Sequence, residues 1–365
     1  MRIQLAAVVL VLSLATLTGC GGSSSAPYVS DIQANQLAYA QTTQFNIKGS
    51  SLDSGLNVTA QGCKSFTSTS AATSSGATWN CVVDAVGTGA VVVQVSTSTG
   101  ELLLSKSFDI TAPTTPVVLS IKADTLMFSK SAQFIMTGYS LDKDFNVSTK
   151  NCKGLALVSG GLSTSKSVTC NVGAVGIGAI SFEAKMSDGT VLNSATFDVP
   201  NPQVTMITNI GTLKLELSPT AAPLTVVNYL QYVNDKFYDN TIIHRIVTSG
   251  IFIAQGGWLT PVPSVQTGQR AAIALEVGKG LSNVKGTIAM ARSTDLNSAT
   301  SQFYLNLADN NTALDTANGG YAVFGKIISG TSVLDALAIT PTSTKYGLSD
   351  FPSQSVVVQS VVQTQ

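Results

Sequence analysis

The sequence is poor in the side chains that support acid–base catalysis, metal binding or nucleic-acid binding. A single histidine, His244, occurs in 365 residues, charged residues make up only 11%, and the formal net charge is zero. Such a chain offers no basic surface to a nucleic-acid backbone. Beyond the first 20 residues, no apolar run is long enough to span a membrane. The frequent Ser, Thr, Gly, Val and Ala residues indicate a protein of short strands and turns.

Two missing motifs restrict the chemistry further. The sequence has no C-x-x-C pair, and one histidine cannot supply a His-rich metal site, so we expect neither a metal nor a cofactor. A Ser-His-Asp hydrolase of the common type would need a G-x-S-x-G nucleophile elbow, which is also missing. We therefore do not expect a hydrolase of this type.

The N-terminus carries an export signal. Arg2 and the apolar run 5–16 precede "LTGC" (17–20), and residues 21–26 are small and polar. This order resembles the signal peptide and lipobox of bacterial lipoproteins, which implies that 1–20 is the signal segment, that Cys20 is acylated and that 21–26 is a flexible tether. The expected location is the bacterial cell envelope, on the outer membrane facing the periplasm, because Gly rather than Asp follows Cys20. The lipid is the only membrane anchor expected; an ordinary signal peptide with an incidental cysteine is the alternative.

A long internal repeat follows. The segment "TTQFNIKGSSLDSGLNVTAQGCKSF" (42–66) matches "SAQFIMTGYSLDKDFNVSTKNCKGL" (131–155), with every residue displaced by 89 positions. One constant offset predicts two copies of one module, at 27–112 and 117–200. Proline-containing linkers, "APTTP" (112–116) and "PNPQ" (200–203), bound the second copy.

Each repeat is predicted to be a small antiparallel β-sandwich, because alternating apolar residues are interrupted by turn residues every few positions. Each also holds one cysteine pair, so an oxidising compartment favours the disulfides Cys63–Cys81 and Cys152–Cys170. Each disulfide would contribute about 3 kcal/mol in the chain-entropy description. A metal site is the alternative use of these cysteines. The repeats loosely resemble immunoglobulin-like sandwiches of bacterial surface proteins, and their ligand is unknown.

The last segment, 203–365, has a different pattern. Residues 204–217 alternate like two strands around a glycine turn. Leu224, Val227, Leu230 and Val233 recur at helical spacing, and 330–338 fits a second helix. The remainder consists mostly of predicted strands, so a closed barrel with two helices is the natural packing.

Three stretches of this segment, "NTIIHRIVTSGIFIAQGGW" (240–258), "GTIAMARSTDLNSATSQFYLNLADN" (286–310) and "GGYAVFGKIISGTSVLDAL" (319–337), resemble the cyclophilin family of peptidyl-prolyl isomerases in its bacterial periplasmic form. The resemblance implies an eight-stranded antiparallel barrel capped by two helices. Together with the two tandem Ig-like sandwiches predicted before it, the barrel makes the expected chain all-β dominated. The resemblance also implies isomerisation of X-Pro bonds in proline-containing client polypeptides, within a groove on the outer face of the barrel.

The resemblance assigns roles to individual residues. The catalytic set is Arg245, Phe252 and Gln255. The substrate-binding set is His244, Ile253, Met290, Ala291, Arg292, Gln302, Phe303, Tyr304, Leu314 and Tyr321. Gln255 and Gln302 would orient the arginine and the substrate carbonyl, while His244 would support the groove without relaying protons.

The sequence also departs from the family pattern. The segment between Arg245 and Phe252 is two residues longer than the common spacing, and Tyr304 takes the place of a Phe. A longer turn would absorb the insertion, whereas a register shift would displace Arg245. The alternative function is therefore a surface binding protein whose barrel grips proline segments without catalysis.

Overall fold

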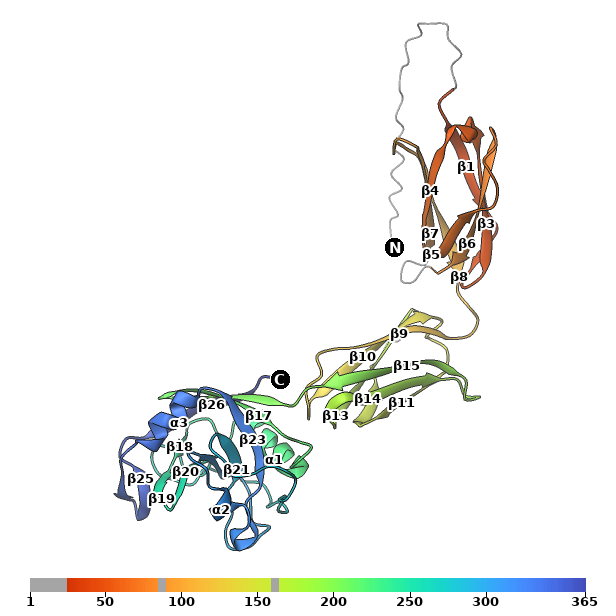
Figure 1. The fold of residues 1–365 in the computed structure, drawn as a ribbon. Helices are drawn as coiled ribbons and strands as arrows, with labels where there is room; N and C mark the ends of the chain where they lie inside the picture. Colours follow the sequence, from red (N-terminus) through yellow and green to blue (C-terminus); the bar gives the residue numbers. More distant parts are fainter. Residues whose placement is uncertain (1–24, 85–89, 159–163) are drawn as a thin grey trace. The chain divides into compact units, whose positions relative to one another are not determined.

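A computed structural model describes residues 25–84, 90–158 and 164–365 (Figure 1). Cys20 and the signal segment lie outside the described residues. The chain forms two compact units that divide between Thr114 and Thr115. Within the described ranges, no helix is both long and apolar enough to cross a membrane.

The first repeat folds as two antiparallel sheets that share one apolar core. One sheet has the order β1 (Tyr28–Ala34), β3 (Thr42–Ser50), β6 (Gly76–Val83), β5 (Cys63–Ser68). The other has the order β2 (Leu37–Ala38), β8 (Leu102–Thr111), β7 (Ala90–Thr97), β4 (Leu56–Gln61), in which only the short β2–β8 pair is parallel, and the turn η1 (Leu52–Ser54) precedes β4. Val91, Val93 and Val95 of β7 are fully buried, as the period of two in a strand requires.

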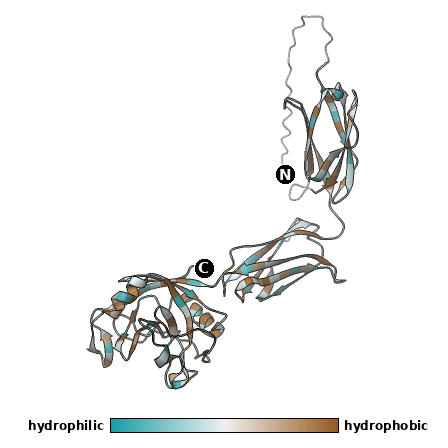
Figure 2. Ribbon diagram, in the orientation of Figure 1, coloured by the Kyte–Doolittle hydropathy of each residue, from teal (hydrophilic) through white to brown (hydrophobic). Residues whose placement is uncertain are grey.

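The second repeat has the same two-sheet arrangement. Its sheets follow the orders β12 (Cys152–Leu157), β13 (Ser165–Val172), β10 (Ser131–Tyr139), β9 (Val117–Ala123) and β11 (Asn146–Lys150), β14 (Gly176–Lys185), β15 (Val191–Val199). Phe134 of the first sheet stacks on Phe182 of the second, with ring centroids 5.0 Å apart. The hydropathy bands that alternate along these strands reflect one buried and one exposed face (Figure 2).

Two pairs of positions, each 89 residues apart, have the same backbone environment in both repeats. A Cβ atom at Gly49 would lie 1.9 Å from the carbonyl oxygen of Tyr28, and one at Gly138 would lie 1.8 Å from that of Val117. Neither position can accept a side chain, because the backbones approach too closely.

The second pair is Gly62, with φ +86°, and Asn151, with φ +63°. Each stands where the chain leaves one sheet and enters the other, and Gly and Asn are among the residues that tolerate this left-handed conformation best. The predicted module is therefore built twice from equivalent positions.

Both predicted disulfides are present. The Cα atoms of Cys63 and Cys81 are 5.4 Å apart, and those of Cys152 and Cys170 are 5.5 Å apart. Each bond joins an edge strand to its neighbour within one sheet, whereas the bond typical of immunoglobulin domains joins the two sheets. The reason is that the chain passes from one sheet to the other at Gly62 and at Asn151. Cys63 and Cys152, which follow directly, therefore lie in the same sheets as Cys81 and Cys170.

The C-terminal segment forms a nearly closed barrel. Its sheet has the order β18 (Thr241–Ile243), β26 (Val356–Gln363), β16 (Gln203–Thr208), β17 (Gly211–Leu217), β23 (Val323–Ser329), β21 (Thr287–Met290), β22 (Phe303–Asn306), β20 (Ile251–Gly256), β19 (Arg245–Ser249). The two end strands, β18 and β19, are separated in the chain by His244 alone. Counted as one interrupted strand, they complete the eight-stranded barrel that the sequence predicts.

Two helices of more than one turn accompany the barrel, α1 (Pro223–Asn234) and α3 (Thr331–Ala338). The shorter turns are α2 (Asn311–Leu314) and η2 (Ala317–Gly319), and a separate hairpin consists of β24 (Thr342–Lys345) and β25 (Leu348–Pro352). The helix at α1 was predicted correctly, but Leu224 does not belong to its buried face. Leu224 is 54% exposed, because the stripe that faces the core begins at Val226 and continues through Tyr229 and Leu230.

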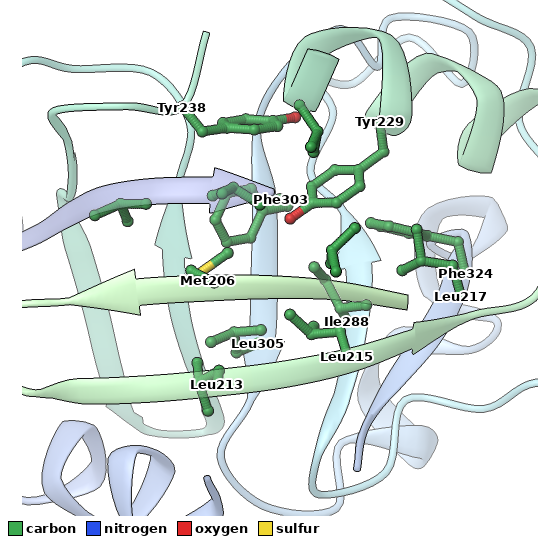
Figure 3. Packing of buried hydrophobic residues seen from close by; sticks show 14 of the residues in the cluster. Met206, Leu213, Leu215, Leu217, Tyr229, Tyr238, Ile288, Phe303, Leu305 and Phe324 are labelled. Atoms are coloured by element: carbon green, nitrogen blue, oxygen red, sulfur yellow. The ribbon is translucent and has the colours of Figure 1, made fainter. Parts of the chain in front are cut away.

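Aliphatic and aromatic side chains pack together in the core of the barrel (Figure 3). Tyr229 of α1 lies 5.1 Å from Phe324 and 6.0 Å from Phe303 between ring centroids. Tyr238 donates its hydroxyl hydrogen to the carbonyl oxygen of Ser301 at 2.9 Å. The barrel interior is therefore a packed core, which leaves its outer face for binding.

Within the second unit, the second repeat also contacts the barrel. The side chain of Phe128 is 4% exposed and belongs to the barrel's core cluster. Gln363 of β26 donates a hydrogen bond of 3.1 Å from its Nε2 to the carbonyl oxygen of Phe128. The linker 200–203 therefore joins two parts that also meet through side chains.

Candidate functional site

Arg245 and Gln255 face each other across the β19–β20 hairpin. The two strands pair without a bulge from Arg245–Gln255 to Ser249–Ile251. Gly250, with φ +74°, makes the turn between them. The two additional residues thus lengthen the hairpin and leave the register at Arg245 intact. Directly opposed residues of an antiparallel pair project to the same face, so Arg245 and Gln255 reach one cavity.

That cavity has a volume of about 160 Å³. Its walls combine two arginines, one glutamine and apolar or aromatic side chains: Arg245, Ile251, Ile253, Gln255, Ala291, Arg292, Tyr304, Leu314 and Tyr321. Eight of these nine residues were predicted as site residues, and Ile251 was not. The structure therefore brings together a charged donor and an apolar pocket on the outside of the barrel.

A second cavity of about 260 Å³ shares Gln255, Ala291 and Arg292 with the first. Its remaining lining residues are Ser293, Ser298, Thr300 and Gln302. Gln255 donates a hydrogen bond of 2.9 Å from its Nε2 to Oε1 of Gln302. Gln255 is thus held by Gln302, and no hydrogen bond from its side chain to Arg245 is formed.

Arg292 is fixed by the loop that follows η2. Its guanidinium donates to the carbonyl oxygen of Gly320 at 3.1 and 2.8 Å and lies 4.5 Å from the ring centroid of Tyr321. The backbone N–H of Ala291 donates to the carbonyl oxygen of Gln302 at 3.0 Å. That N–H is therefore occupied, and the carbonyl oxygen of Ala291 is the group that can meet a peptide.

Four predicted site residues line neither cavity: His244, Phe252, Met290 and Phe303. Phe252 is 39% exposed and projects from the other face of β20, because side chains alternate along a strand and Ile251, Ile253 and Gln255 take the cavity face. Met290 and Phe303 are 1% and 0% exposed and belong to the barrel core. Phe252, Met290 and Phe303 therefore do not border these two cavities, and their contact with a substrate stays a prediction.

His244 supports the site from behind. It is 4% exposed, and its ring packs edge-on against Trp258 at 5.3 Å between centroids. Burial lowers the pKa of His244 to about 4, a backbone hydrogen bond at Ile242 opposes this shift, and the charge of Arg245 adds to it. The imidazole is therefore neutral at physiological pH and is not placed to relay protons.

A buried polar network beneath the pocket gave no signal in the sequence. The hydroxyl of Tyr304 donates to Oδ1 of Asn283 at 2.7 Å, and Nδ2 of Asn306 donates to the same oxygen at 3.2 Å. Asn283 and Asn306 are fully buried. Burial raises the pKa of Tyr304, so its hydroxyl stays protonated and can donate this bond. The hydroxyl that replaces a Phe at the pocket wall thus points away from the cavity.

The network continues to the strand that carries the pocket wall. Asn310 donates from its Nδ2 to Oδ1 of Asn306 and to the carbonyl oxygen of Phe252, both at 2.8 Å. The N–H of Phe252 donates in turn to Oδ1 of Asn310 at 2.9 Å. Phe252 therefore takes part in the site through its backbone, which fixes the positions of its neighbours Ile251 and Ile253.

One acidic residue of the site was also missed. Asp350 of β25 places its Oδ2 at 3.4 Å from Nε of Arg245. Among the described residues, no group of three or more His, Cys, Asp or Glu side chains forms a metal site. The site thus combines Arg245, which has a carboxylate partner, with Arg292, Gln255 and apolar walls.

Comparison with known proteins agrees with this geometry. Residues 203–363 match the family described as "Cyclophilin type peptidyl-prolyl cis-trans isomerase/CLD". A peptidyl-prolyl cis-trans isomerase of Acinetobacter baylyi is 43% identical over 163 residues, which cover 44% of this chain and 85% of that protein. The isomerase cyp18 of Streptomyces antibioticus is 43% identical over 161 residues, which cover 43% of this chain and 95% of that protein.

Among solved structures, a Cryptosporidium parvum cyclophilin-type isomerase crystallised in the presence of the dipeptide Ala-Pro is 30% identical. The match has a TM-score of 0.37 and covers 45% of this chain and 99% of that one. The family match covers residues 203–363, which form the barrel that holds the pocket, and the two relatives are isomerases of the same family name. Through this C-terminal barrel, the chain belongs to the cyclophilin-type peptidyl-prolyl cis-trans isomerases and is an isomerase of X-Pro peptide bonds.

Proposed function

We propose that this isomerase acts on X-Pro bonds of extracytoplasmic polypeptides and is attached to the membrane by a lipid on Cys20. The observation that carries the site assignment is the position of Arg245 at the rim of a pocket whose other walls include Ile253, Tyr304 and Leu314. The apolar walls would accept the proline ring, and the guanidinium would face the amide nitrogen of the same residue.

The reaction explains why these residue types suffice. Rotation about a peptide bond is opposed by roughly 18–20 kcal/mol of amide resonance. As the bond twists, the nitrogen loses its conjugation and becomes a better hydrogen-bond acceptor. Arg245 can donate to that nitrogen, because a guanidinium stays charged and holds its donors in a fixed plane. A hydrogen bond that is stronger in the twisted state than in the planar state accelerates the rotation.

The experiment that tests this assignment is a comparison of the full chain with its Arg245→Ala variant on a short proline peptide, in an assay that reports the cis-to-trans rate. The wild-type chain should accelerate the interconversion, and the variant should lose most of the acceleration while it still binds the peptide. A wild-type chain that binds proline peptides without accelerating their interconversion would instead be a surface binding protein.

The location outside the cytoplasm is supported by two features of the chain. The segment "LTGC" (17–20) resembles the lipobox at which bacterial lipoproteins are acylated. Each repeat carries a disulfide, and disulfides persist in oxidising compartments such as the periplasm. The Cys20→Ser variant should leave the membrane fraction and become soluble. If it stays with membranes after a salt wash, another element holds the protein there.

We propose that the repeats are Ig-like sandwiches that hold the isomerase away from the membrane. Two antiparallel sheets around one core support this assignment, although the disulfide lies within one sheet. Proline-containing clients would meet the barrel alone. Deletion of 27–112 with retention of the tether should therefore leave the rate on a short peptide unchanged.

A further inference from the structure

The β24–β25 hairpin lies beside β19 and is fixed to the barrel by an aromatic anchor. Phe351 is 5% exposed and forms a small apolar cluster with Ile242 and Leu259. Tyr346 and Gly347, with φ +55° and +76°, make the tight turn between the two strands. The strand that holds Phe351 therefore has a defined position next to the segment that carries Arg245.

Asp350, the residue before this anchor, has an unusual backbone. Its φ is +58°, in the left-handed region that costs most side chains of order 1 kcal/mol and that Asp and Asn adopt more readily. In this conformation its carboxylate reaches Nε of Arg245, with an N–O distance of 3.4 Å. The two side chains are 38% and 41% exposed, so the pair lies at the rim of the pocket.

We propose that Asp350 is a positioning residue for the isomerase reaction, which holds Arg245 by its Nε so that the terminal nitrogens face the peptide. A guanidinium has five N–H groups, of which Nε carries one. A contact at Nε therefore leaves the four terminal donors for the substrate. Gln255 does not take this role in the structure: its Nε2 donates to Gln302, and the hydrogen bond of the Arg245 guanidinium goes to Asp350.

The contact matters because an arginine side chain at the surface has many rotamers. Without a partner, the guanidinium would sample positions away from the amide nitrogen, and small misplacements of a catalytic group lower the rate strongly. The pair is half exposed, so dissolved salt should weaken it. This inference rests on the role proposed above for Arg245.

The test uses the full chain and two variants of Asp350. Asp350→Ala removes the contact, whereas Asp350→Asn retains the shape, the tolerance of a positive φ and one oxygen acceptor for Nε. We expect Asp350→Ala to lower kcat about three- to tenfold with little change in KM, and Asp350→Asn to lower it less. Raising the salt concentration from about 0.05 to about 1 M should lower kcat/KM of the wild type but not that of Asp350→Ala.

A matched control is the pair of Lys326 and Glu216, which also has an N–O distance of 3.4 Å and lies away from the pocket. Glu216→Gln should change neither kcat nor its dependence on salt. Thermal unfolding of every variant shows whether the hairpin and barrel remain folded. If Asp350→Ala is unfolded, Asp350→Asn replaces it in the test. The salt dependence of kcat/KM should then be weaker in Asp350→Asn than in the wild type, and an equal dependence would contradict the inference.

The decisive measurement is a double-mutant cycle with Arg245→Ala. If Asp350 acts through the arginine, Asp350→Asn should lower activity in the wild-type background and have no effect in the Arg245→Ala background. An equal loss in both backgrounds, or a gain of activity in Asp350→Asn, overturns the inference. If Arg245→Ala itself retains full activity, the proposed role of Arg245 fails, and this result is distinct from a failure at Asp350 alone.

Discussion

Arg245 lies directly opposite Gln255 in the β19–β20 pair, although the segment that connects them is two residues longer than the common family spacing. The additional residues extend the hairpin toward Gly250 and do not disturb the end of the ladder at the barrel. The position of Arg245 therefore depends on strand pairing and not on the length of the turn.

The first prediction follows for Arg245. Arg245→Ala should keep the fold, because the side chain is 41% exposed and supports little packing. It should lower kcat/KM about 10- to 100-fold, since the twisted amide loses a charge-assisted donor worth roughly 1.5–3 kcal/mol. Arg245→Lys should restore the rate only in part, because an ammonium lacks the planar set of donors.

Protease-coupled isomerisation of a proline peptide measures these rates. His244→Gln is the control, since a buried imidazole that stays neutral and lines neither cavity has no proton to exchange with a substrate, and its effect on the rate should be mild. A loss of activity in His244→Gln together with normal activity in Arg245→Ala would show that the mechanism is wrong.

A second prediction concerns the two faces of β20. Ile251 lines the cavity and Phe252 does not, although the two are neighbours in the chain. Ile251→Asn should therefore raise KM for a proline peptide several-fold, whereas Phe252→Asn should leave it nearly unchanged. Steady-state kinetics of the two variants at one temperature make the comparison. The reverse order of effects would place the phenylalanine in the pocket and the isoleucine outside it.

A third prediction concerns stability at acidic pH. The pKa of His244 is about 4 in the folded chain against 6.5 in the unfolded chain, so between these values the unfolded state holds a proton that the folded state lacks. Lowering the pH from 6.5 to 4 should thus reduce the free energy of unfolding by roughly 3 kcal/mol through this residue.

Urea unfolding across this pH range provides the measurement. The loss on acidification should be smaller in His244→Gln than in the wild type, because Gln does not titrate. Parallel pH profiles of the two proteins would show that His244 is accessible and protonates normally in the folded state.

A fourth prediction concerns the polar network under the pocket. Tyr304→Phe removes the donor to Asn283, which leaves a fully buried amide oxygen with one remaining side-chain donor, Nδ2 of Asn306. The free energy of unfolding should fall by about 1–2 kcal/mol. Tyr346→Phe is a suitable control, because Tyr346 is 71% exposed. An unchanged stability in Tyr304→Phe would mean that the hydroxyl contributes no net free energy to the fold.

The sequence predicted most of the residues that line the pocket because they lie in short runs that resemble the motifs of the cyclophilin family. It did not show that Phe252 and Ile253 project to opposite faces of β20, because the motif alone does not say which face meets the cavity. Leu224 was predicted to lie on the buried face of α1 but is exposed. More than one set of apolar residues in this helix has helical spacing, and only the packing against the barrel determines which set is buried.

The residues that the sequence did not reveal are those whose role depends on distant contacts. Asp350 follows Arg245 by 105 positions and meets it only through the β24–β25 hairpin. Asn283 and Asn310 stand in polar stretches that resemble surface loops, and Asn306 is a single polar residue between Leu305 and Leu307. No local pattern distinguishes a solvated asparagine from one that is buried and hydrogen-bonded, so three-dimensional packing is needed to identify this network.

The position of the disulfides in the repeats has a mechanical consequence. Cys63 and Cys152 lie at the start of β5 and β12, which are the outermost strands of their sheets. An outer strand is the one that can peel away and pair with a second chain. The bond to Cys81 or Cys170 prevents that peeling at the point where the strand enters the sheet. In a reducing solution, therefore, β5 and β12 should detach first, and chains would begin to exchange strands while the apolar cores are still intact.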